Sequence, residues 1–252
     1  MKFFTMSAQL ISALLISCKP TYFIQKSEHS MYVLSDTSNT TIDSSVYKLI
    51  LPYKEKVIGT MSVVIAESEF VMERGVPESK LGNFVSDACM YETSKVFYPS
   101  DGHPVDFAFF NNGGLRKSLP QGKITLGDVY ELMPFENQLV VLSVNGKLVK
   151  KIFNFIASKD GAPISGARFQ IKDQQGMNIT IQNEPLDTAK IYKVLTSDYL
   201  ANGGDSFDFL IDVPRESVNL KIRDALIQNL MTAGKEGKKI KVILDGRISN
   251  ER

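Results

Sequence analysis

The chain has 252 residues, of which 43% are hydrophobic and 23% charged, and this composition is typical of a globular protein rather than a disordered one. Lys and Arg number 29 and Asp and Glu 28, so the net charge of +1 provides no basic field for binding nucleic acid. The two histidines, His29 and His103, are too few for a zinc or binuclear hydrolase site, which uses several histidine ligands.

The N-terminal segment has the pattern of an export signal. Lys2 precedes a mostly apolar run from Phe3 to Leu15, which is shorter than the roughly 20 residues that a bilayer span needs. We therefore predict a signal over residues 1–17. Leu15-Ile16-Ser17-Cys18 resembles the bacterial lipobox, in which the cysteine is lipidated and becomes the mature N-terminus. The alternative is an ordinary signal peptide with a chance cysteine.

Residues 18–45 are polar and predict a flexible tether between the lipid and a domain at 46–252. We thus expect an exported protein, anchored by Cys18 in the bacterial cell envelope, at the periplasm or outer membrane. Cys89 is the other cysteine, so no disulfide framework is expected, and its amphipathic surroundings predict a buried, inert thiol.

The first half of the predicted domain alternates strands with helices. Residues 46–58 form either a short helix or an extended arm, because Pro52 weakens the helical alternative. Residues 61–66 predict a strand, and Ser79 predicts the N-cap of a long helix with apolar residues at i+3 and i+4 spacing. The strand predicted at 105–110 ends at Asn111-Asn112-Gly113-Gly114.

The second half contains further strands and three helices. The predicted helices are 125–132, 147–157 and a last one beginning at Ser217; the predicted strands are 139–144, 169–171, 179–181, 191–196 and 240–244. The strands 169–171 and 179–181 predict a hairpin around Gly176. This mixture of hairpin and helical connections predicts an α+β fold, with a mixed β-sheet and helices packed on it.

Two glycine-rich loops are candidates for ligand binding, since each follows a predicted strand. They are Asn111 to Arg116 and Asn202-Gly203-Gly204-Asp205. Paired glycines let backbone N–H groups approach a ligand closely. Arg116 offers a planar fork to phosphate or carboxylate, and Asp205 suits the vicinal hydroxyls of a ribose.

Two aromatic residues lie next to these loops. Phe135 follows Pro134 at a predicted helix end, and Tyr199 precedes the second loop. Such rings stack on flat bases, although core filling is the alternative for Phe135. Asn137 either reads a base edge with its amide or caps a turn.

Five ordered motifs together resemble the C-terminal, substrate-binding domain of the 5′-nucleotidase and UDP-sugar hydrolase family. The motifs are Leu81 to Ala88, Asn111 to Arg116, Met133-Pro134-Phe135, Tyr199 to Phe207, and Asp245-Gly246-Arg247-Ile248. The resemblance implies that Phe135 and Tyr199 clamp a nucleobase and that Asn137 contacts it. It also implies that Asp205 contacts the ribose and that Asn111 and Arg116 reach the sugar-phosphate.

The same resemblance implies roles for four further residues. Arg74 is the candidate for an upstream phosphate-binding arginine, although its spacing departs from the family's, and Gly166 is expected close to the base. Asn83 and Asp87 are expected to fix the helix against the loops.

Complete members of the family carry an N-terminal metallophosphoesterase domain with two divalent metals, and the Asp-x-His, Gly-Asn-His-Asp/Glu and Gly-His-x-His motifs of that domain are absent here. We therefore expect no catalytic residue, metal site or cofactor in this chain. The leading hypothesis is the nucleotide-binding half of a split nucleotidase, with the metals on a separate metallophosphoesterase chain. The alternative is a non-enzymatic envelope lipoprotein that captures nucleotides or nucleotide sugars.

Overall fold

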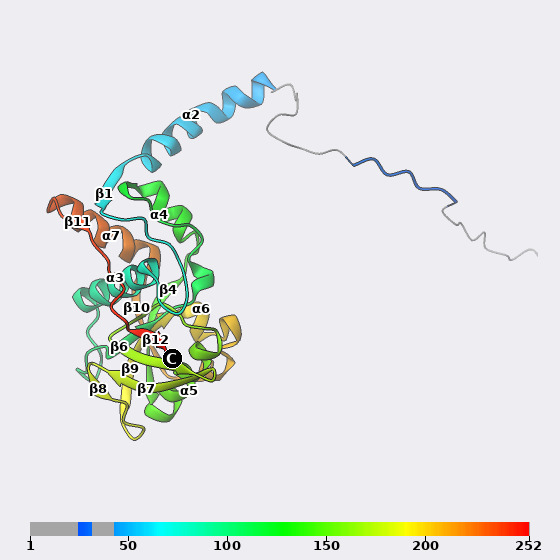
Figure 1. The fold of residues 1–252 in the computed structure, drawn as a ribbon. Coiled ribbons are helices and arrows are strands. Elements are labelled where there is room, and N and C mark those ends of the chain that lie inside the picture. Colours follow the sequence, from blue (N-terminus) through cyan, green and yellow to red (C-terminus); the bar gives the residue numbers. More distant parts are fainter. Residues whose placement is uncertain (1–24, 32–42, 252) are drawn as a thin grey trace, which may run out of the picture. The chain divides into compact units, whose positions relative to one another are not determined.

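The computed structural model describes residues 25–31 and 43–251. The predicted export signal, Cys18 and much of the predicted tether lie outside these residues. Contacts divide the chain between Lys48 and Leu49, and the fold described here is that of the second unit (Figure 1). No helix within the described ranges is long and apolar enough to cross a membrane.

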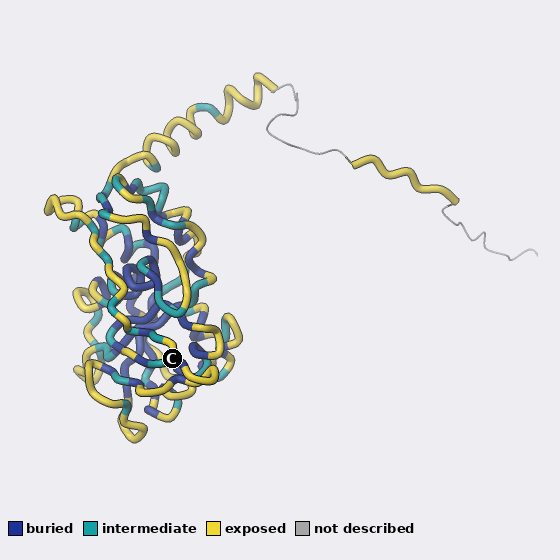
Figure 2. Tube along the Cα trace, viewed as in Figure 1, coloured by how far each residue is buried: buried dark blue, intermediate teal, exposed yellow. Residues whose placement is uncertain are grey.

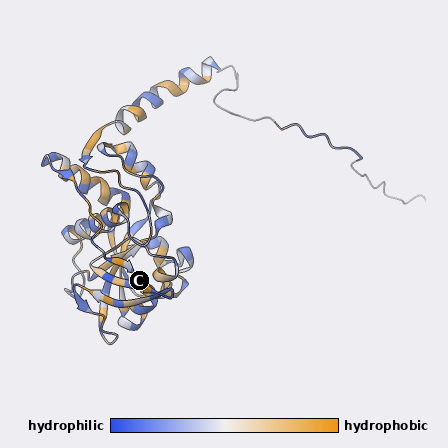
Figure 3. Cartoon of the chain, in the orientation of Figure 1, coloured by the Kyte–Doolittle hydropathy of each residue, from blue (hydrophilic) through white to orange (hydrophobic). Residues whose placement is uncertain are grey.

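The first described helix is α2 (Ser44–Met61), so the helical alternative for residues 46–58 is confirmed. It continues through Pro52 and none of its residues is buried (Figure 2). Apolar and polar residues alternate along its length (Figure 3). Proline removes one backbone donor from a helix interior, which explains why the sequence alone left this element open.

A five-stranded mixed sheet forms the centre of the domain, with strand order β10-β4-β9-β2-β5. Its strands are β2 (Phe107–Phe109), β4 (Gln138–Asn145), β5 (Ile164–Ser165), β9 (Ile191–Ser197) and β10 (Arg215–Lys221). β2 and β9 run parallel, whereas β4 is antiparallel to β9. The central strands are apolar at successive positions because both faces of this sheet are covered.

One face of the sheet is covered by α3 (Lys80–Val96) and α7 (Ile222–Lys235), which pack on each other. The other face is covered by α5 (Gly146–Ser158) and a second sheet, ordered β12-β6-β7-β8. The strands of this second sheet are β6 (Ala167–Lys172), β7 (Gln175–Ile181), β8 (Glu184–Pro185) and β12 (Ile248–Asn250). The central sheet therefore separates two hydrophobic cores. Successive side chains of β2 point to opposite faces, so Phe107 and Phe109 enter one core and Ala108 enters the other.

A smaller sheet, ordered β11-β1-β3, lies at the α2 end of the domain. It consists of β1 (Val64–Ser68), β3 (Gly122–Thr125) and β11 (Lys239–Ile240). Thr125 caps α4 (Leu126–Leu132) through a capping box with Asp128, and Ser79 caps α3 by accepting from the Gly82 N–H. Both predicted helix starts are therefore confirmed.

The prediction that Ser217 begins the last helix is wrong, because residues 215–221 form strand β10 and α7 begins at Ile222. Val218 and Leu220 are buried and alternate with exposed Ser217 and Asn219, which is the two-residue period of a strand. Residues 215–221 form a strand because they pair with β4. That pairing cannot be predicted from a short stretch of sequence.

Two further boundaries differ from prediction. The hairpin of β6 and β7 turns at Asp173-Gln174, which have positive φ, whereas Gly176 lies within β7 against Phe153. The predicted strand 240–244 is reduced to β11, and β12 pairs instead at Ile248–Asn250. The first predicted strand is shifted from 61–66 to 64–68, because α2 extends to Met61.

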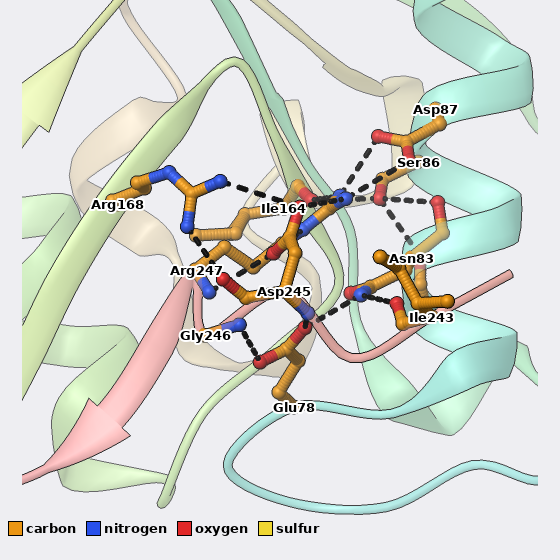
Figure 4. Close-up of polar contacts among 11 residues, drawn as sticks. Glu78, Asn83, Ser86, Asp87, Ile164, Arg168, Ile243, Asp245, Gly246 and Arg247 are labelled. Atoms are coloured by element: carbon orange, nitrogen blue, oxygen red, sulfur yellow. Dashed lines mark hydrogen bonds and ion pairs between the residues drawn. The ribbon is translucent and has the colours of Figure 1, made fainter. Parts of the chain in front are cut away.

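Side chains bind the backbone of residues 243–246 in place of a strand partner (Figure 4). Glu78 accepts hydrogen bonds from the N–H groups of Asp245 (2.8 Å) and Gly246 (3.0 Å). The Asn83 amide donates to the Ile243 carbonyl at 3.0 Å. This explains why a run of apolar residues here forms no extended strand.

Arg247 joins this segment to α3. Its guanidinium donates to both carboxylate oxygens of Asp87, at 2.8 and 3.0 Å, and to the Ile164 carbonyl at 2.8 Å (Figure 4). It also pairs with Asp245 at 3.0 Å. The Arg247 side chain is only 11% exposed, so these charge-assisted bonds are largely shielded from solvent.

We predict that Arg247→Met lowers the free energy of unfolding by about 2–4 kcal/mol, because it leaves the Asp87 and Asp245 carboxylates without their shielded cation. Urea titration followed by circular dichroism measures the change. Arg168→Met is the matched control, since Arg168 also contacts Asp245 but is 47% exposed and should contribute less than about 1 kcal/mol. Equal losses in the two variants would contradict this assignment.

Candidate functional site

Strand direction brings three loops to one edge of the central sheet. β2 and β9 are parallel neighbours, so their carboxyl ends, at Phe109 and Ser197, lie at the same edge. β4 is antiparallel to β9 and pairs Leu139 with Ser197, which places the start of β4 at that edge too. The residues just before β4 and just after β2 and β9 therefore meet.

The Asp205 carboxylate connects the two glycine-rich loops. The Asn111 amide donates to Asp205 Oδ2 at 2.7 Å, and the Tyr199 hydroxyl donates to Asp205 Oδ1 at 2.7 Å. The backbone N–H of Asp205 in turn donates to the Tyr199 oxygen at 3.2 Å. Each carboxylate oxygen can accept a second hydrogen bond, so the group can still bind hydroxyls of a ligand.

The Tyr199 ring lies directly over Gly204. A Cβ at position 204 would approach the ring carbons to 2.5 Å, so no side chain fits there. The hydrogen bond to Asp205 raises the pKa of the Tyr199 hydroxyl above its usual value and keeps it protonated as a donor. Asp205 and Ser206 both have positive φ, a strained backbone that these contacts maintain.

The loop that carries Phe135 and Asn137 is held by Arg223 of α7. The Arg223 guanidinium donates to the carbonyls of Met133 (3.4 Å) and Pro134 (3.3 Å) and pairs with Glu136. Its Cζ lies 4.3 Å from the centroid of the Tyr130 ring, and only 6% of Arg223 is exposed. No local sequence pattern connects Arg223 with this loop.

Glu136 is the anionic partner within the same loop. It pairs with Lys221 and with Arg223, and these cations lower its pKa to about 2. Two further hydrogen bonds complete the attachment: the Ile222 N–H donates to the Asn137 carbonyl at 3.0 Å, and the Gln138 N–H donates to the Asp198 carboxylate at 3.0 Å. The sequence offered no signal for the ion pairs, because the partners are more than eighty positions apart.

Six of the predicted site residues border one pocket of about 310 Å³, which we call the Phe135 pocket. Phe135 is 41% exposed and Tyr199 43% exposed, so neither ring fills the core. Arg116 is exposed, and its guanidinium donates a 3.4 Å hydrogen bond from Nη1 to the Gly113 carbonyl. The lining residues are Asn111, Gly113, Gly114, Arg116, Phe135, Asn137, Tyr199 and Asp205.

The structure does not bring Arg74 or Gly166 to this pocket. Arg74 donates to the Leu115 carbonyl at 3.5 Å and thus supports the backbone next to Arg116. Gly166 has a φ of +76° and borders a separate polar cavity of about 160 Å³ with Arg168 and Arg247. Their predicted contacts with phosphate and base therefore lack the geometry that the other six residues share.

Side chains of several chemical kinds border the Phe135 pocket. It combines two aromatic rings, side-chain amides, a guanidinium and a carboxylate. No group of three or more His, Cys, Asp and Glu residues that could hold a metal occurs within the described part of the chain. His29 and His103 are exposed, and neither borders this pocket. Cys89 is buried, and this burial raises the pKa of its thiol.

The family of this chain follows from its similarity to a known family model. Residues 57–212, more than half of the chain, match the family model described as 5′-nucleotidase, C-terminal domain. The chain belongs to this family. The matched range includes every residue of the Phe135 pocket. It also includes β2, β4 and β9, whose ends form the sheet edge at this pocket.

The chain is also similar to several named proteins. The chain is 27% identical to an apyrase from Tabanus yao over 206 residues, covering 69% of this chain and 37% of the apyrase. It is 30% identical to a 5′-nucleotidase from Vibrio parahaemolyticus over 195 residues, covering 73% and 33%. The crystal structure of a 5′-nucleotidase precursor from Thermus thermophilus superposes with a TM-score of 0.68 at 28% identity, covering 82% and 43%. The chain thus spans about a third of the length of these two sequence relatives.

We predict that Arg223→Met increases amide exchange at Phe135, Glu136 and Asn137 at least about tenfold. The substitution removes the donor to two carbonyls and one of the two cations paired with Glu136, contacts worth roughly 1.5–3 kcal/mol when a charge is involved. Hydrogen-exchange mass spectrometry measures the change, with α5 as the internal reference.

Lys221→Met is the matched control, because it removes the other, more exposed partner of Glu136 and leaves the carbonyl contacts intact. We expect a smaller increase in exchange for this variant. Unchanged exchange in Arg223→Met would show that Arg223 does not position the loop.

Proposed function

We propose that this chain is the nucleotide-binding part of a split 5′-nucleotidase-type phosphohydrolase. One observation carries the proposal: Asn111, Arg116, Phe135, Asn137, Tyr199 and Asp205 come from three separate loops, yet all border one pocket. Two rings suit a flat base, Asp205 suits ribose hydroxyls, and the Arg116 guanidinium suits an anionic phosphate. Membership of the 5′-nucleotidase C-terminal domain family supports the same ligand class.

The catalytic metals belong, in this proposal, to a separate metallophosphoesterase chain. The donor set of the described residues does not fit two divalent cations, since no suitable cluster of His, Cys, Asp and Glu occurs among them. Two metals on the partner would activate water and neutralise the leaving phosphate. Lipidation at Cys18 would place this chain in the cell envelope, and anchoring of the partner on the same membrane would raise their effective concentration.

A second candidate function is nucleotide capture without catalysis. The observation that favours it is that the whole Phe135 pocket is built by one chain, so binding needs no partner. Both functions require the same base-stacking pocket. They differ in whether a partner phosphatase turns over the bound nucleotide.

We predict that Phe135→Ala and Tyr199→Ala each weaken the binding of AMP and UMP about five- to a hundredfold, because stacking one base on one ring contributes roughly 1–3 kcal/mol. Isothermal titration calorimetry gives the dissociation constants. Tyr199→Phe keeps the ring but removes the hydroxyl bonded to Asp205, so its loss of affinity should be smaller than that of Tyr199→Ala.

Tyr98→Ala is the control for loss of a surface aromatic, since Tyr98 is 84% exposed and does not border the pocket. It should leave the dissociation constants unchanged. Unaltered binding in both Phe135→Ala and Tyr199→Ala would show that the base does not stack between these loops.

We further predict that the purified chain, mixed with AMP or UMP and Mg²⁺ or Mn²⁺, releases no inorganic phosphate above the background without protein. Adding an exported metallophosphoesterase from the same cell should start turnover, and Phe135→Ala should then raise KM. A malachite-green phosphate assay follows both experiments. Robust turnover by the chain alone would overturn the split-enzyme proposal, whereas binding without turnover in any combination would favour nucleotide capture.

A further inference from the structure

A second pocket of about 370 Å³ adjoins the Phe135 pocket. We call it the Phe155 pocket. Three residues border both pockets: Asn111, Gly113 and Asp205. The remaining residues lining the Phe155 pocket are Phe110, Asn112, Phe155, Ile156, Lys159, Gly161, Ala162, Ser206 and Phe207.

The walls of the Phe155 pocket are mainly apolar and aromatic. Phe155, near the end of α5, meets Phe207 edge to face with ring centroids 4.5 Å apart. Phe207 is 6% exposed, whereas Phe155 is only partly buried. An apolar surface that is left uncovered beside a ligand site gains free energy when a flat or apolar group of the ligand covers it.

One cation lies at the rim of this pocket. Lys159 follows α5, and its Nζ is 5.5 Å from the centroid of the Phe155 ring. It forms no ion pair with any residue that the structure describes. Because the Asp205 carboxylate also borders this pocket, its lining carries one charge of each sign and suits a neutral planar group.

The boundary between the two pockets is polar. It consists of the 2.7 Å hydrogen bond between Asn111 and Asp205, together with Gly113. A Cβ at position 113 would lie 3.3 Å from Asn111 Nδ2 and 3.6 Å from Asp205 Oδ2, so a side chain here would stand beside that bond. Glycine leaves the boundary free of such a side chain.

We propose that the Phe135 and Phe155 pockets form one bipartite site. The ligand class is a nucleotide that carries a second planar group: its base binds at Phe135 and Tyr199, its polar linking atoms cross at Asn111 and Asp205, and its second ring covers Phe155. This inference rests on the proposed nucleotide binding and adds a preference among nucleotides.

The test compares a nucleotide with the same nucleotide carrying an added ring. The probes are AMP and UMP and their 2′/3′-O-(N-methylanthraniloyl) derivatives, titrated calorimetrically into the full chain. We expect the derivative of the better-bound nucleotide to bind about fivefold to tenfold more tightly than its parent. Its fluorescence should also shift to shorter wavelength, as in an apolar environment.

Ala162→Trp fills the Phe155 pocket from a position outside the Phe135 pocket. We expect the ratio of the two dissociation constants to fall to about one in this variant. Ala189→Trp is the matched control, since Ala189 is exposed and borders neither pocket, and it should keep the ratio of the unmodified chain. Phe155→Ala removes the proposed stacking partner and should also lower the ratio, which keeps the test available if Ala162→Trp does not fold.

The possible failures are distinguishable. If neither nucleotide binds, the proposed function is overturned and the bipartite site with it. If a nucleotide binds but its derivative binds no more tightly, only the bipartite site is overturned. A ratio that persists in folded Ala162→Trp and Phe155→Ala would also overturn it, because the added ring would then bind elsewhere.

Discussion

The Asp205 carboxylate is the contact on which the candidate site depends. It accepts from Asn111 in one glycine-rich loop and from Tyr199 at the start of the other, and so fixes two loops that are about ninety residues apart in sequence. The backbone at Asp205 and Ser206 adopts positive φ, a conformation that costs of order 1–3 kcal/mol per residue and persists only where surrounding contacts impose it. The same carboxylate forms the boundary between two adjoining pockets.

Strand order explains why these loops meet at all. A parallel pair, β2 and β9, ends at one edge of the central sheet, and antiparallel β4 begins there. The sheet is covered on both faces by buried side chains, so this edge is rigid, while the loops beyond it are free to vary. The arrangement brings two aromatic rings, a guanidinium and a carboxylate to one pocket, and the proposed nucleotide binding rests on this combination.

Two arginines attach segments of the chain that lie outside the β-strands. Arg223 binds the carbonyls before Phe135, and Arg247 binds the Ile164 carbonyl together with the Asp87 carboxylate. A guanidinium suits this task because its five donors form a planar fork that stays charged at any physiological pH. In both places a largely buried guanidinium adds bonds to carbonyl and carboxylate oxygens beside the backbone hydrogen bonds at Asn137 and Arg247.

Sequence patterns were enough to predict the family, the α+β class, the helix starts at Ser79 and Thr125, and six residues of the Phe135 pocket, because caps, apolar periodicity and short motifs are local. The folded chain was needed to show that residues 215–221 are a strand, that Gly166 and Arg74 lie apart from the pocket, and that Arg223 supports Phe135. Each of these depends on a partner distant in the chain: β4 for the strand, Arg247 for the cavity at Gly166, Leu115 for Arg74, and α7 for the Phe135 loop. Local propensity carries no information about such partners, since burial and pairing are properties of the assembled sheet.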